Sequence, residues 1–546
     1  MFITFGRVLY SELSFKISSI SQIDKDQSKV SYYLLAYARD FVRVDGSALQ
    51  VTHTAHFGCA QRIAPFVLLP SPFPRTEFNK AVELQPVLNE LMHKVAHDDE
   101  FLTRTLENAL QVDEFTANLF DIWVKVRDEG MAQPISLGML RSDIMLESRC
   151  PHTENQCAKH TPYCSWKQVE INSIASGFGH LGPTLSLGLF RSDYLMQNPD
   201  GNSIKQVEFN TVASSFGAIA AHLPDMTWYP TFKLPFKNLI AKYLQMPPNP
   251  ALSGLCSGIT EAYDLFGVPR AVVLFVVEEV SYNICDQRFH EFEISEKRPE
   301  IMIYRRTLTE IYDETTLNDK KQLIDGHPVA VVYYRSGYEP AQYPSAKEWD
   351  ARLRVERSTA IKCPSIHYQL AGTKKVQQAL AAPGVLEKFM GAGAATGRVR
   401  DIFTGLYSLD FDENGERAVD MALADAERFV LKPQREGGGN NLYGSDVREA
   451  LLRMRHSRER AAYILMERIL PPLVAGYVVR PGAAVPPPLT DLVSELGIFG
   501  VIIGTKDKIY CNRQAGHMLR TKLADANEGG VAAGLGALDS PYLLDL

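Results

Sequence analysis

The sequence predicts a mixed fold, α+β or α/β, whose first quarter is mainly helical and whose last third is rich in strands. Helical periodicity runs through YYLLAYARDFVRV (32–44), FNKAVELQPVLNELMHKVAH (78–97) and FTANLFDIWVKVRDEG (115–130),. Two unbroken apolar runs, AVVLFVV (271–277) and PVAVVYY (328–334), are typical of buried strands,. Together these observations favour an α/β unit at about 270–370, separate from the rest of the chain.

Further elements follow in order along the chain. A strand is expected at 205–210 and a helix at 254–267, ahead of the two apolar runs, and an amphipathic helix at 348–358 follows them,. Strands are then predicted at 428–433 and 461–469, and the run 494–503 is expected to pair with 508–512,. The closing segment 528–542 is rich in glycine and alanine, and we expect it to be a mobile loop that approaches a ligand closely,.

Composition excludes several classes of function. The chain has 546 residues, of which 45% are hydrophobic and 22% charged, and a formal net charge of −7. Such a charge offers no broad positive field for nucleic acid or for an anionic membrane, so a phosphate ligand has to meet locally placed cations. No apolar run is long enough to span a bilayer, and Arg7, Glu12 and Lys16 interrupt the opening segment,. We therefore expect a cytoplasmic protein that binds small molecules.

The chain contains an internal duplication. SLGMLRSDIML (136–146) recurs at 186–196, and KQVEINSIASGFG (167–179) recurs at 205–217, within tandem segments 134–183 and 184–223,. The offset falls from 50 residues at the first pair to 38 at the second, so the first copy holds 12 extra residues. One site can use only one copy of a strand. The other copy is extruded, adds an edge strand, or reflects an error in the coding sequence.

The extra residues include a group of possible zinc ligands. Cys150, His152, Cys157, His160 and Cys164 lie close together in the sequence, but their spacing does not match a paired CxxC pattern,. A disordered insertion is the favoured interpretation of this segment.

A glycine-rich loop carries the clearest chemical signal. Lys432-Pro-Gln-Arg-Glu-Gly-Gly-Gly-Asn-Asn-Leu-Tyr-Gly444 directly follows the predicted strand RFVL. Consecutive glycines allow backbone N–H groups to approach phosphate oxygens where a β-carbon would collide. Lys432 supplies a cation, and Glu436 and Asn441 supply oxygen ligands of the kind that Mg²⁺ prefers. The loop therefore predicts a triphosphate and magnesium site, although it matches neither GxxxxGK[ST] nor GxGxxG.

The chain resembles the eukaryotic glutathione synthetases of the ATP-grasp superfamily from about residue 30 to its end. The resemblance is carried by RSDY, EFNTVASSFG, NICDQR, QLAGTKKVQQ, FVLKPQREGGGNNLYG, YILMERI, SELGIFG, GHMLRTK and GGVAAGLGALDSPY, in the order of the family. It implies an ATP-grasp fold with a helical N-terminal region and an inserted, smaller α/β substrate-binding domain. The implied division is an extra N-terminal segment 1–25, a first part of the ATP-grasp core 26–269, the insertion 270–372 and a C-terminal part 373–546.

The resemblance also implies a reaction. ATP phosphorylates the C-terminal carboxylate of γ-glutamylcysteine, and the amine of glycine then attacks the acyl phosphate, so that positioning and charge neutralisation lower the barrier. Mg²⁺, two ions per site, would be the cofactor, and the protein would be a homodimer. Arg520 and Lys432 would be the catalytic residues. Arg520 and Lys522 alternate in RTK, so an extended conformation would place both on one face.

Further site residues are implied by similarity. The metal ligands would be Glu208, Asn210 and Glu436. ATP would be surrounded by Glu208, Lys374, Lys432, Gln434, Glu436, Gly437, Gly438, Gly439, Asn440, Asn441, Tyr443, Met466, Glu467, Arg468, Ile469, Glu495, Lys522 and Glu528. The peptide or glycine would be bound by Arg191, Ala213, Ser215, Asn283, Gln287, Arg335, Ser336, Gly337, Tyr338, Arg520, Val531 and Ala532.

Two choices stay open in the sequence. The second copy is preferred as the functional one, because Ser215 has a hydroxyl where the first copy has Gly177; with the first copy, Arg141, Glu170 and Asn172 would take the roles of Arg191, Glu208 and Asn210. At the substrate end, Ser281 and Tyr282 stand where the family usually has Glu-Arg, and Ser336 stands in place of Asp. The alternatives to a glutathione synthetase are thus a diverged ligase with another peptide or amino-acid acceptor, and a non-catalytic binding protein.

Overall fold

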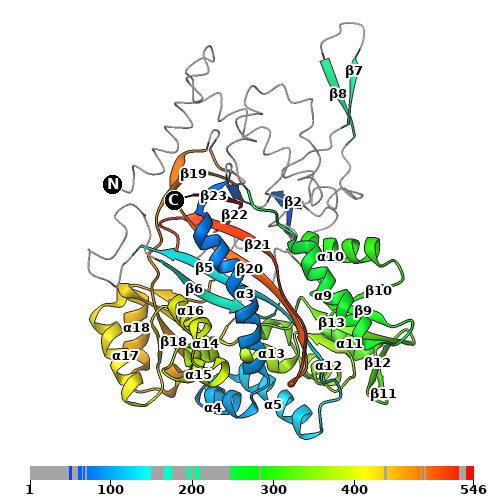
Figure 1. Cartoon of the computed structure of the whole chain (residues 1–546), viewed down its shortest axis with the longest axis horizontal. Coiled ribbons are helices and arrows are strands. Elements are labelled where there is room, and N and C mark those ends of the chain that lie inside the picture. The colour runs from blue at the N-terminus through cyan, green and yellow to red at the C-terminus, as the bar shows by residue number, and fades with distance from the viewer. Residues whose placement is uncertain are drawn as a thin grey trace.

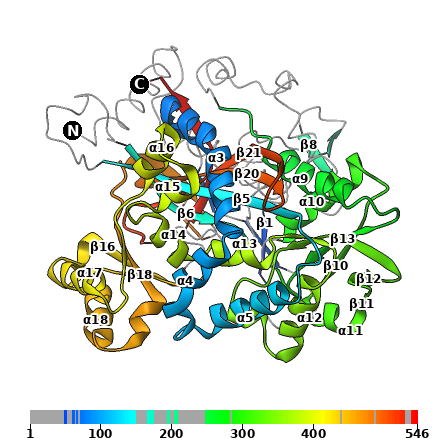
Figure 2. The same cartoon turned by 60° about the horizontal axis from the view of Figure 1, so that its bottom comes forward.

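The structure is a computed structural model. It describes residues 48–51, 60–63, 65–67, 70–148, 165–174, 193–197, 203–208, 246–281, 284–435, 439–480, 482–484, 487–527 and 536–545. Figures 1 and 2 show a central sheet with a four-stranded sheet and its helices on one side and a second mixed α/β unit on the other.

The central sheet has seven strands in the order β19-β3-β22-β21-β20-β5-β6. Neighbouring strands are antiparallel apart from the parallel pair β22 and β3. The long hairpin of β20 and β21 is its centre, as the predicted pairing of 494–503 with 508–512 indicated. The strands are β3 (Phe66–Val67), β5 (Ser136–Glu147), β6 (Ser165–Asn172), β19 (Val474–Val479), β20 (Leu489–Gly504), β21 (Ile509–Leu523) and β22 (Gly536–Asp539).

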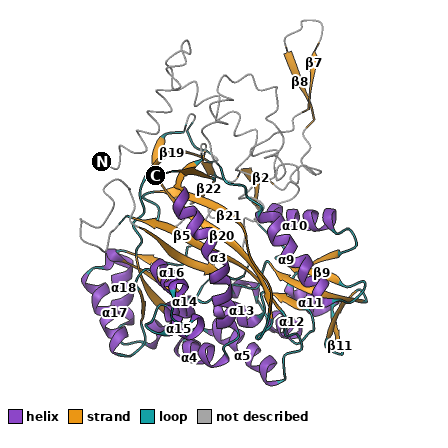
Figure 3. Ribbon diagram, in the orientation of Figure 1, coloured by secondary structure: helices purple, strands orange, loops and turns teal. Residues whose placement is uncertain are grey.

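Helices pack on both faces of the central sheet, and Figure 3 shows one of them crossing the face turned toward the viewer. α3 (Arg75–Ala96) packs on one face with Leu140, Ile498 and Ile502, and α9 (Ala251–Phe266) packs on the other with Leu137, Met139 and Val501. The alternation of these side chains along β5 and β20 follows from the two-residue period of a strand. α4 (Asp99–Leu110) and α5 (Glu114–Asp128) follow α3, and each begins at a capping aspartate, Asp98 and Asp113,.

The second α/β unit contains a six-stranded sheet in the order β10-β9-β13-β12-β11, with β14 also pairing with β13. β9, β10, β13 and β14 are parallel, which matches the unbroken apolar runs that predicted buried strands,. The strands are β9 (Val272–Val276), β10 (Met302–Arg306), β11 (Thr316–Asn318), β12 (Lys321–Ile324), β13 (His327–Tyr334) and β14 (Ile361–Cys363). The helices are α10 (Ile284–Lys297), α11 (Leu308–Glu314), η1 (Pro340–Gln342) and α12 (Ala346–Glu356).

The third sheet has four antiparallel strands in the order β15-β18-β16-β17. α17 (Glu413–Ala424) and α18 (Ser445–Met454) close a separate apolar core with it. The strands are β15 (Leu406–Ser408), β16 (Phe429–Pro433), β17 (Leu442–Tyr443) and β18 (Tyr463–Glu467). Helices α13 (Ile366–Ala371), α14 (Lys374–Leu380), α15 (Val385–Met390) and α16 (Ala394–Ile402) precede this sheet, and η2 (Ala426–Arg428) and η3 (Arg458–Ala462) lie within the same part of the chain.

Three short pairs complete the described elements. β1 (Ala48–Val51) pairs with β2 (Ala60–Ile63), β4 (Ser71–Pro74) with β23 (Pro541–Leu544), and β7 (Asp193–Gln197) with β8 (Ser203–Glu208). Within the described ranges, no helix is both long and apolar enough to cross a bilayer.

The duplicated segments occupy different places. β5 and β6 come from the first copy and lie in the central sheet, whereas β7 and β8, from the second copy, form a two-stranded sheet of their own (Figure 1). The described strands of the second copy therefore add no edge strand to the central sheet. The preference for the second copy as the active-site strand does not match this arrangement. In chain order the first copy follows α5 after a short connection between Asp128 and Ser136.

Other parts of the sequence prediction have mixed outcomes. The helices expected at 78–97, 115–130, 254–267 and 348–358 are α3, α5, α9 and α12. The closing segment is not a loop throughout, because β22 pairs with β21 and buries Ala537 and Leu538. Helices α13 to α18 were not anticipated in the last third, which was expected to be rich in strands. The helix expected at 32–44 lies outside the described residues.

Three histidines meet in the core where α3 packs against α13. The ring centroids of His93 and His97 are 4.4 Å apart, and those of His97 and His367 are 4.8 Å apart. His93 Nδ1 is hydrogen-bonded to the Tyr368 hydroxyl, and His93 Nε2 lies 2.8 Å from the backbone oxygen of Thr505. Burial lowers the pKa of His93 to about 4, and burial also lowers the pKa of His97 and, well below its usual value, that of His367.

This cluster predicts loss of stability in acid. Between about pH 6.5 and 5.5 these histidines bind fewer protons in the folded chain than in the unfolded one, so each lowers the free energy of unfolding by up to about 1 kcal/mol over this range. Asp539 opposes this below pH 6, because burial raises its pKa to about 6. We expect the three histidines together to lower the free energy of unfolding by up to about 3 kcal/mol between pH 6.5 and 5.5, of which Asp539 offsets about 0.7 kcal/mol,. Urea denaturation across this range tests it, and His367→Gln should reduce the fall in the free energy of unfolding by up to about 1 kcal/mol. An unchanged slope would contradict the assignment.

Candidate active site

Strands β5 and β6 place four polar side chains on one face of the central sheet. Arg141 stands opposite Asn172, and Asp143 stands opposite Glu170. Residues opposite one another on paired strands, and residues two apart on one strand, share a face. The first copy of the duplicated segment therefore presents an arginine, an amide and two carboxylates together.

Asp143 lies at the centre of this group. Its Oδ1 accepts from Arg141 Nε at 2.7 Å and its Oδ2 accepts from Arg141 Nη2 at 2.8 Å. The same Oδ2 accepts from Asn172 Nδ2 at 3.0 Å and from Arg520 Nη2 at 3.5 Å. Because Asp143 is fully buried, these bonds fix the directions of two guanidinium groups from different strands.

The β20–β21 hairpin adds a second charged pair beside the first. Arg520 stands opposite Glu495, and its Nε donates to Glu495 Oε1 at 2.7 Å. Burial raises the pKa of Glu495. Arg520 acts in the opposite direction, whereas the negative charges of Asp143 and Glu170 add to the rise. RTK is extended within β21, as the predicted alternation of Arg520 and Lys522 requires.

Two lysines reach this face from the part of the chain that follows the α/β unit. Lys432, on β16, donates from Nζ to the backbone oxygen of Val169 at 3.2 Å, which joins the four-stranded sheet to β6. Lys374, the first residue of α14, has its Nζ 4.0 Å from Glu170 Oε2 and 2.5 Å from the backbone oxygen of Arg435. Gln434 Oε1 accepts from the backbone N–H of Lys375 at 3.0 Å. Lys432 from β16 and Lys374 from the start of α14 therefore both lie beside the end of β6 that carries Glu170.

The charges around Glu170 set its protonation. Burial alone would raise its pKa, but Lys374, Lys432, Arg520 and Arg141 together hold the pKa at about 2. Glu170 is therefore ionised at neutral pH, and its side chain keeps 23% of its surface exposed. An ionised, partly open carboxylate among four cations can bind a metal ion, and the cations can bind phosphate.

The described end of the glycine-rich loop leads into β17. Gly439 has φ 93°, a left-handed conformation that favours glycine,. Asn440 and Asn441 follow, and Tyr443 pairs with Val430 of β16. The predicted nucleotide-binding loop therefore returns to the same strand that carries Lys432.

The predicted segment Met466–Ile469 lies on the other side of β16. Met466 pairs with Val430, and the Tyr407 hydroxyl donates to Glu467 Oε1 at 3.1 Å. The backbone N–H of Arg468 donates to the backbone oxygen of Arg428 at 2.8 Å. The segment thus begins in β18 of the four-stranded sheet and continues directly beyond it.

Five of the residues predicted for the peptide or glycine form a second group, in the α/β unit. Gln287 lies in α10, and Arg335, Ser336, Gly337 and Tyr338 directly follow β13. One short helix connects the two groups. In α13, Gln369 Nε2 donates to the backbone oxygen of Gly337 at 3.0 Å, and α13 is followed within three residues by Lys374.

Several predicted residues lie outside the described residues. For Glu208, only the backbone at the end of β8 is described. The possible zinc ligands within 150–164 also lie outside. The others are Arg191, Asn210, Ala213, Ser215, Asn283, Glu436, Gly437, Gly438, Glu528, Val531 and Ala532.

Asp143 is the residue of this face to which the sequence assigned no role. A signal existed, because Arg-Ser-Asp occurs in both copies and its alternation places Arg141 and Asp143 on one face,. Across the described ranges, no group of three or more histidine, cysteine, aspartate or glutamate side chains is arranged to hold a metal ion. Glu170 and Asn172 nevertheless offer two oxygen ligands on one face, of the type that Mg²⁺ accepts beside water and phosphate.

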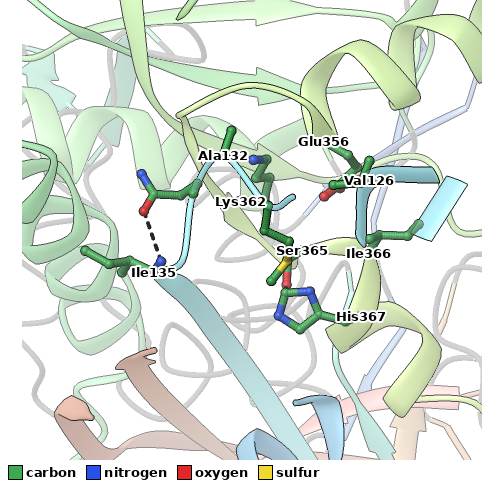
Figure 4. Close-up of a pocket in the computed structure, with 10 residues that line it drawn as sticks. Val126, Ala132, Ile135, Glu356, Lys362, Ser365, Ile366 and His367 are labelled. Atoms are coloured by element: carbon green, nitrogen blue, oxygen red, sulfur yellow. Dashed lines mark hydrogen bonds between the residues drawn. The ribbon is translucent and has the colours of Figure 1, made fainter. Parts of the chain in front are cut away.

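A small hollow near the histidine cluster is not part of this site. Figure 4 shows it beside His367, with Lys362, Glu356 and Ser365 around it. None of its lining residues belongs to the group around Glu170. The candidate site is therefore defined by converging charges, and not by this hollow.

Gly372 fixes the approach of α14 to β6. A β-carbon at this position would lie 2.2 Å from Ser173 Oγ and 3.1 Å from Ser173 Cβ. We expect Gly372→Ala to lower the free energy of unfolding by about 1–3 kcal/mol, because overpacking shifts the backbone. Urea denaturation measures this. Ser173→Ala added to Gly372→Ala should recover most of the loss, and a double variant as unstable as Gly372→Ala would show that another contact is responsible.

Comparisons with known proteins agree with the geometry. A family model described as eukaryotic glutathione synthase, ATP binding domain, matches residues 28–186 and 182–543, and these two matches meet between the duplicated copies. The chain is 37% identical over 522 residues to glutathione synthetase of Xenopus laevis, covering 95% of this chain and 98% of that protein. It is 41% identical over 481 residues to glutathione synthetase of Homo sapiens, covering 88% and 90%.

The chain is also similar to a plant protein and to a solved structure. The chloroplastic glutathione synthetase of Arabidopsis thaliana is 37% identical over 484 residues, covering 88% of this chain and 79% of that protein. Among solved structures, a glutathione synthetase-like effector from Globodera pallida, in its apo form, aligns with a TM-score of 0.66 and 22% identity. The alignment covers 96% of this chain and 99% of that one and supports the predicted ATP-grasp type of fold.

Proposed function

The chain belongs to the eukaryotic glutathione synthase family and is an ATP-dependent ligase, and from this premise we propose that it joins glycine to γ-glutamylcysteine through an acyl phosphate. The observation that supports this most directly is the convergence of Arg141, Lys374, Lys432 and Arg520 on Glu170. A triphosphate and a carboxylate that react with one another need cations on both sides, and these four come from four different elements.

The roles of the residues follow from their positions. Lys374 and Lys432 would bind phosphate oxygens of ATP, between β6 and the four-stranded sheet. A carboxylate oxygen of the peptide attacks the γ-phosphorus, ADP leaves, and the glycine amine then displaces phosphate from the acyl carbon and loses a proton. Arg520, held by Glu495, would stabilise the charge that develops on the reacting carboxylate.

We also propose that Mg²⁺ is held by Glu170 and Asn172, with Glu436 from the glycine-rich loop. Bound there, the ion would neutralise charge on the phosphate oxygens. Glu170 and Asn172 thus take the roles that the sequence gave to Glu208 and Asn210, and Arg141 takes that of Arg191. A homodimer and a cytoplasmic location are further proposals, which rest on the family resemblance.

The test is release of ADP by the purified protein. ADP should appear only when ATP, Mg²⁺, γ-glutamylcysteine and glycine are all present, together with glutathione detected by mass spectrometry. Turnover that is independent of glycine would contradict the proposal, and so would the absence of turnover.

A second candidate is a ligase with another acceptor. It is favoured by Ser281 and Ser336, both buried and neutral, at the substrate end. A panel of γ-glutamyl peptides and amino acids separates the two, because a strong preference for γ-glutamylcysteine plus glycine would eliminate this candidate.

A further inference from the structure

The α/β unit has a topological switch point, which is the position at which open parallel sheets form a ligand-binding crevice,. The parallel strands are ordered β10-β9-β13-β14, so the chain passes from β9 to β10 on one side and then crosses to β13 on the other. In open parallel sheets, ligands bind outside the carboxyl ends of the strands where the order reverses. Here those ends are followed by Glu278 after β9 and by Arg335 to Tyr338 after β13.

Most charges at this crevice are compensated within the protein. Arg335 Nη2 lies 3.1 Å from Asp286 Oδ2, and both side chains are buried. Arg305 donates to Gln287 Oε1 at 2.8 Å and forms an ion pair with Glu291. Arg335 still has an unused donor, because its buried Nε has no hydrogen-bond partner among the described residues.

Glu278 differs from the other charged groups of the crevice. Its Oε1 accepts from Gln342 Nε2 at 2.6 Å, and Gln342 Oε1 accepts from the backbone N–H groups of Gly337 and Tyr338 at 2.6 and 2.9 Å. Glu278 is thereby tied to the loop that follows Arg335. Arg305 and Arg335 pair with Glu291 and Asp286 instead, and among the described residues no lysine or arginine lies within ion-pair distance of Glu278. A half-buried carboxylate without a cation is suited to bind the cation of a ligand.

The neighbouring positions do not supply this charge. Ser281 is neutral, and its hydroxyl accepts from Gln287 Nε2 at 2.7 Å. Ser336 is neutral and buried. An α-amino acid head group carries one ammonium and one carboxylate, so it needs an anion and a cation close together. Glu278 and Arg335 offer that combination.

We propose that Glu278 is a specificity-determining residue that binds the α-ammonium group of the γ-glutamyl moiety of the peptide substrate. This inference rests on the proposed function, and it names a carboxylate in a part of the site where Ser281 and Ser336 are neutral. The enzyme would then distinguish peptides with an α-ammonium group from those without one through the carboxylate of Glu278, the second residue after β9.

The experiment compares Glu278→Gln with Glu279→Gln, a matched change at the adjacent, exposed glutamate. Glu278→Gln should raise KM for γ-glutamylcysteine about 30- to 150-fold and leave KM for ATP within about threefold, because a charge-assisted contact to the peptide alone is lost. Glu279→Gln should change neither constant, and Glu278→Asp should restore part of the affinity.

A substrate analogue separates recognition from a structural role. N-glutarylcysteine lacks the α-amino group, so wild type and Glu278→Gln should use it with equal KM. An unchanged KM for γ-glutamylcysteine in Glu278→Gln, or an equal rise in KM for both peptides, would overturn the proposal.

Failure of the proposed function can be distinguished from failure of the role of Glu278. If wild type does not turn over γ-glutamylcysteine, that function fails, and calorimetric titration of both peptides into wild type and Glu278→Gln then decides on Glu278. Tighter binding of γ-glutamylcysteine than of N-glutarylcysteine by wild type, lost in the variant, supports the role. Equal affinities, or no binding, overturn it.

Discussion

Glu170→Gln is expected to lower kcat about 10²- to 10³-fold, whereas Glu208→Gln, the same change in the second copy, is expected to leave kcat within about twofold. Glu170 is ionised and lies among four cations in the central sheet, while Glu208 ends a hairpin that forms a separate sheet. Glutamine keeps the shape of the side chain and removes its charge. Steady-state release of ADP at saturating substrate measures the effect.

The two substitutions are matched, because each falls in the same sequence, Lys-Gln-Val-Glu. A higher Mg²⁺ concentration should partly restore Glu170→Gln, since the metal site is weakened and the nucleotide contacts of Lys374 and Lys432 remain. Thermal midpoints control for folding. Inactivation by Glu208→Gln with an active Glu170→Gln would reverse the assignment and show that the second copy works.

The sequence predicted elements whose signal is local. The apolar runs of β9 and β13, and the pairing of β20 with β21, could be recognised because each strand carries its own pattern,. The resemblance supplied the site residues that lie on these strands, including Arg520 and Glu495. Both face the candidate site in the structure.

The choice between the copies could not be made in the same way. Both copies carry Arg-Ser-Asp and Lys-Gln-Val-Glu, so their side chains favour the same strand positions. What separates them is the connection: α5 ends at Asp128 and β5 begins at Ser136, so the first copy lies next to the free edge of β20. The preference for the second copy rests on the local difference at Ser215, and which copy is functional stays a prediction that Glu170→Gln and Glu208→Gln test.

β22 shows the same limit on a smaller scale. Its glycine and alanine content predicted a loop, yet Leu538 pairs with Arg520 and is buried. Short strands of this kind are stabilised by distant partners, which no local pattern reveals. The central position of Asp143 is also non-local, because its partners Asn172 and Arg520 are supplied by other strands.

Asp143→Asn should therefore be among the most damaging single changes in the chain, although the resemblance assigned Asp143 no role. The fully buried carboxylate is the partner of Arg141 and also contacts Arg520, so its removal leaves buried positive charge without its nearest counter-charge. Breaking a buried ion pair from one side costs about 3–5 kcal/mol.

Urea denaturation should show this loss for Asp143→Asn, and Asp193→Asn, the matched change in the second copy, should shift the free energy of unfolding by less than about 0.5 kcal/mol. Activity should fall as well, because Arg520 would keep Glu495 but lose the contact that joins it to β5. Equal stabilities of the two variants would mean that Glu170 already compensates Arg141. In that case Asp143 and Glu170 together compensate the charge of Arg141, and the large loss of stability should appear only in the Asp143→Asn/Glu170→Gln double variant.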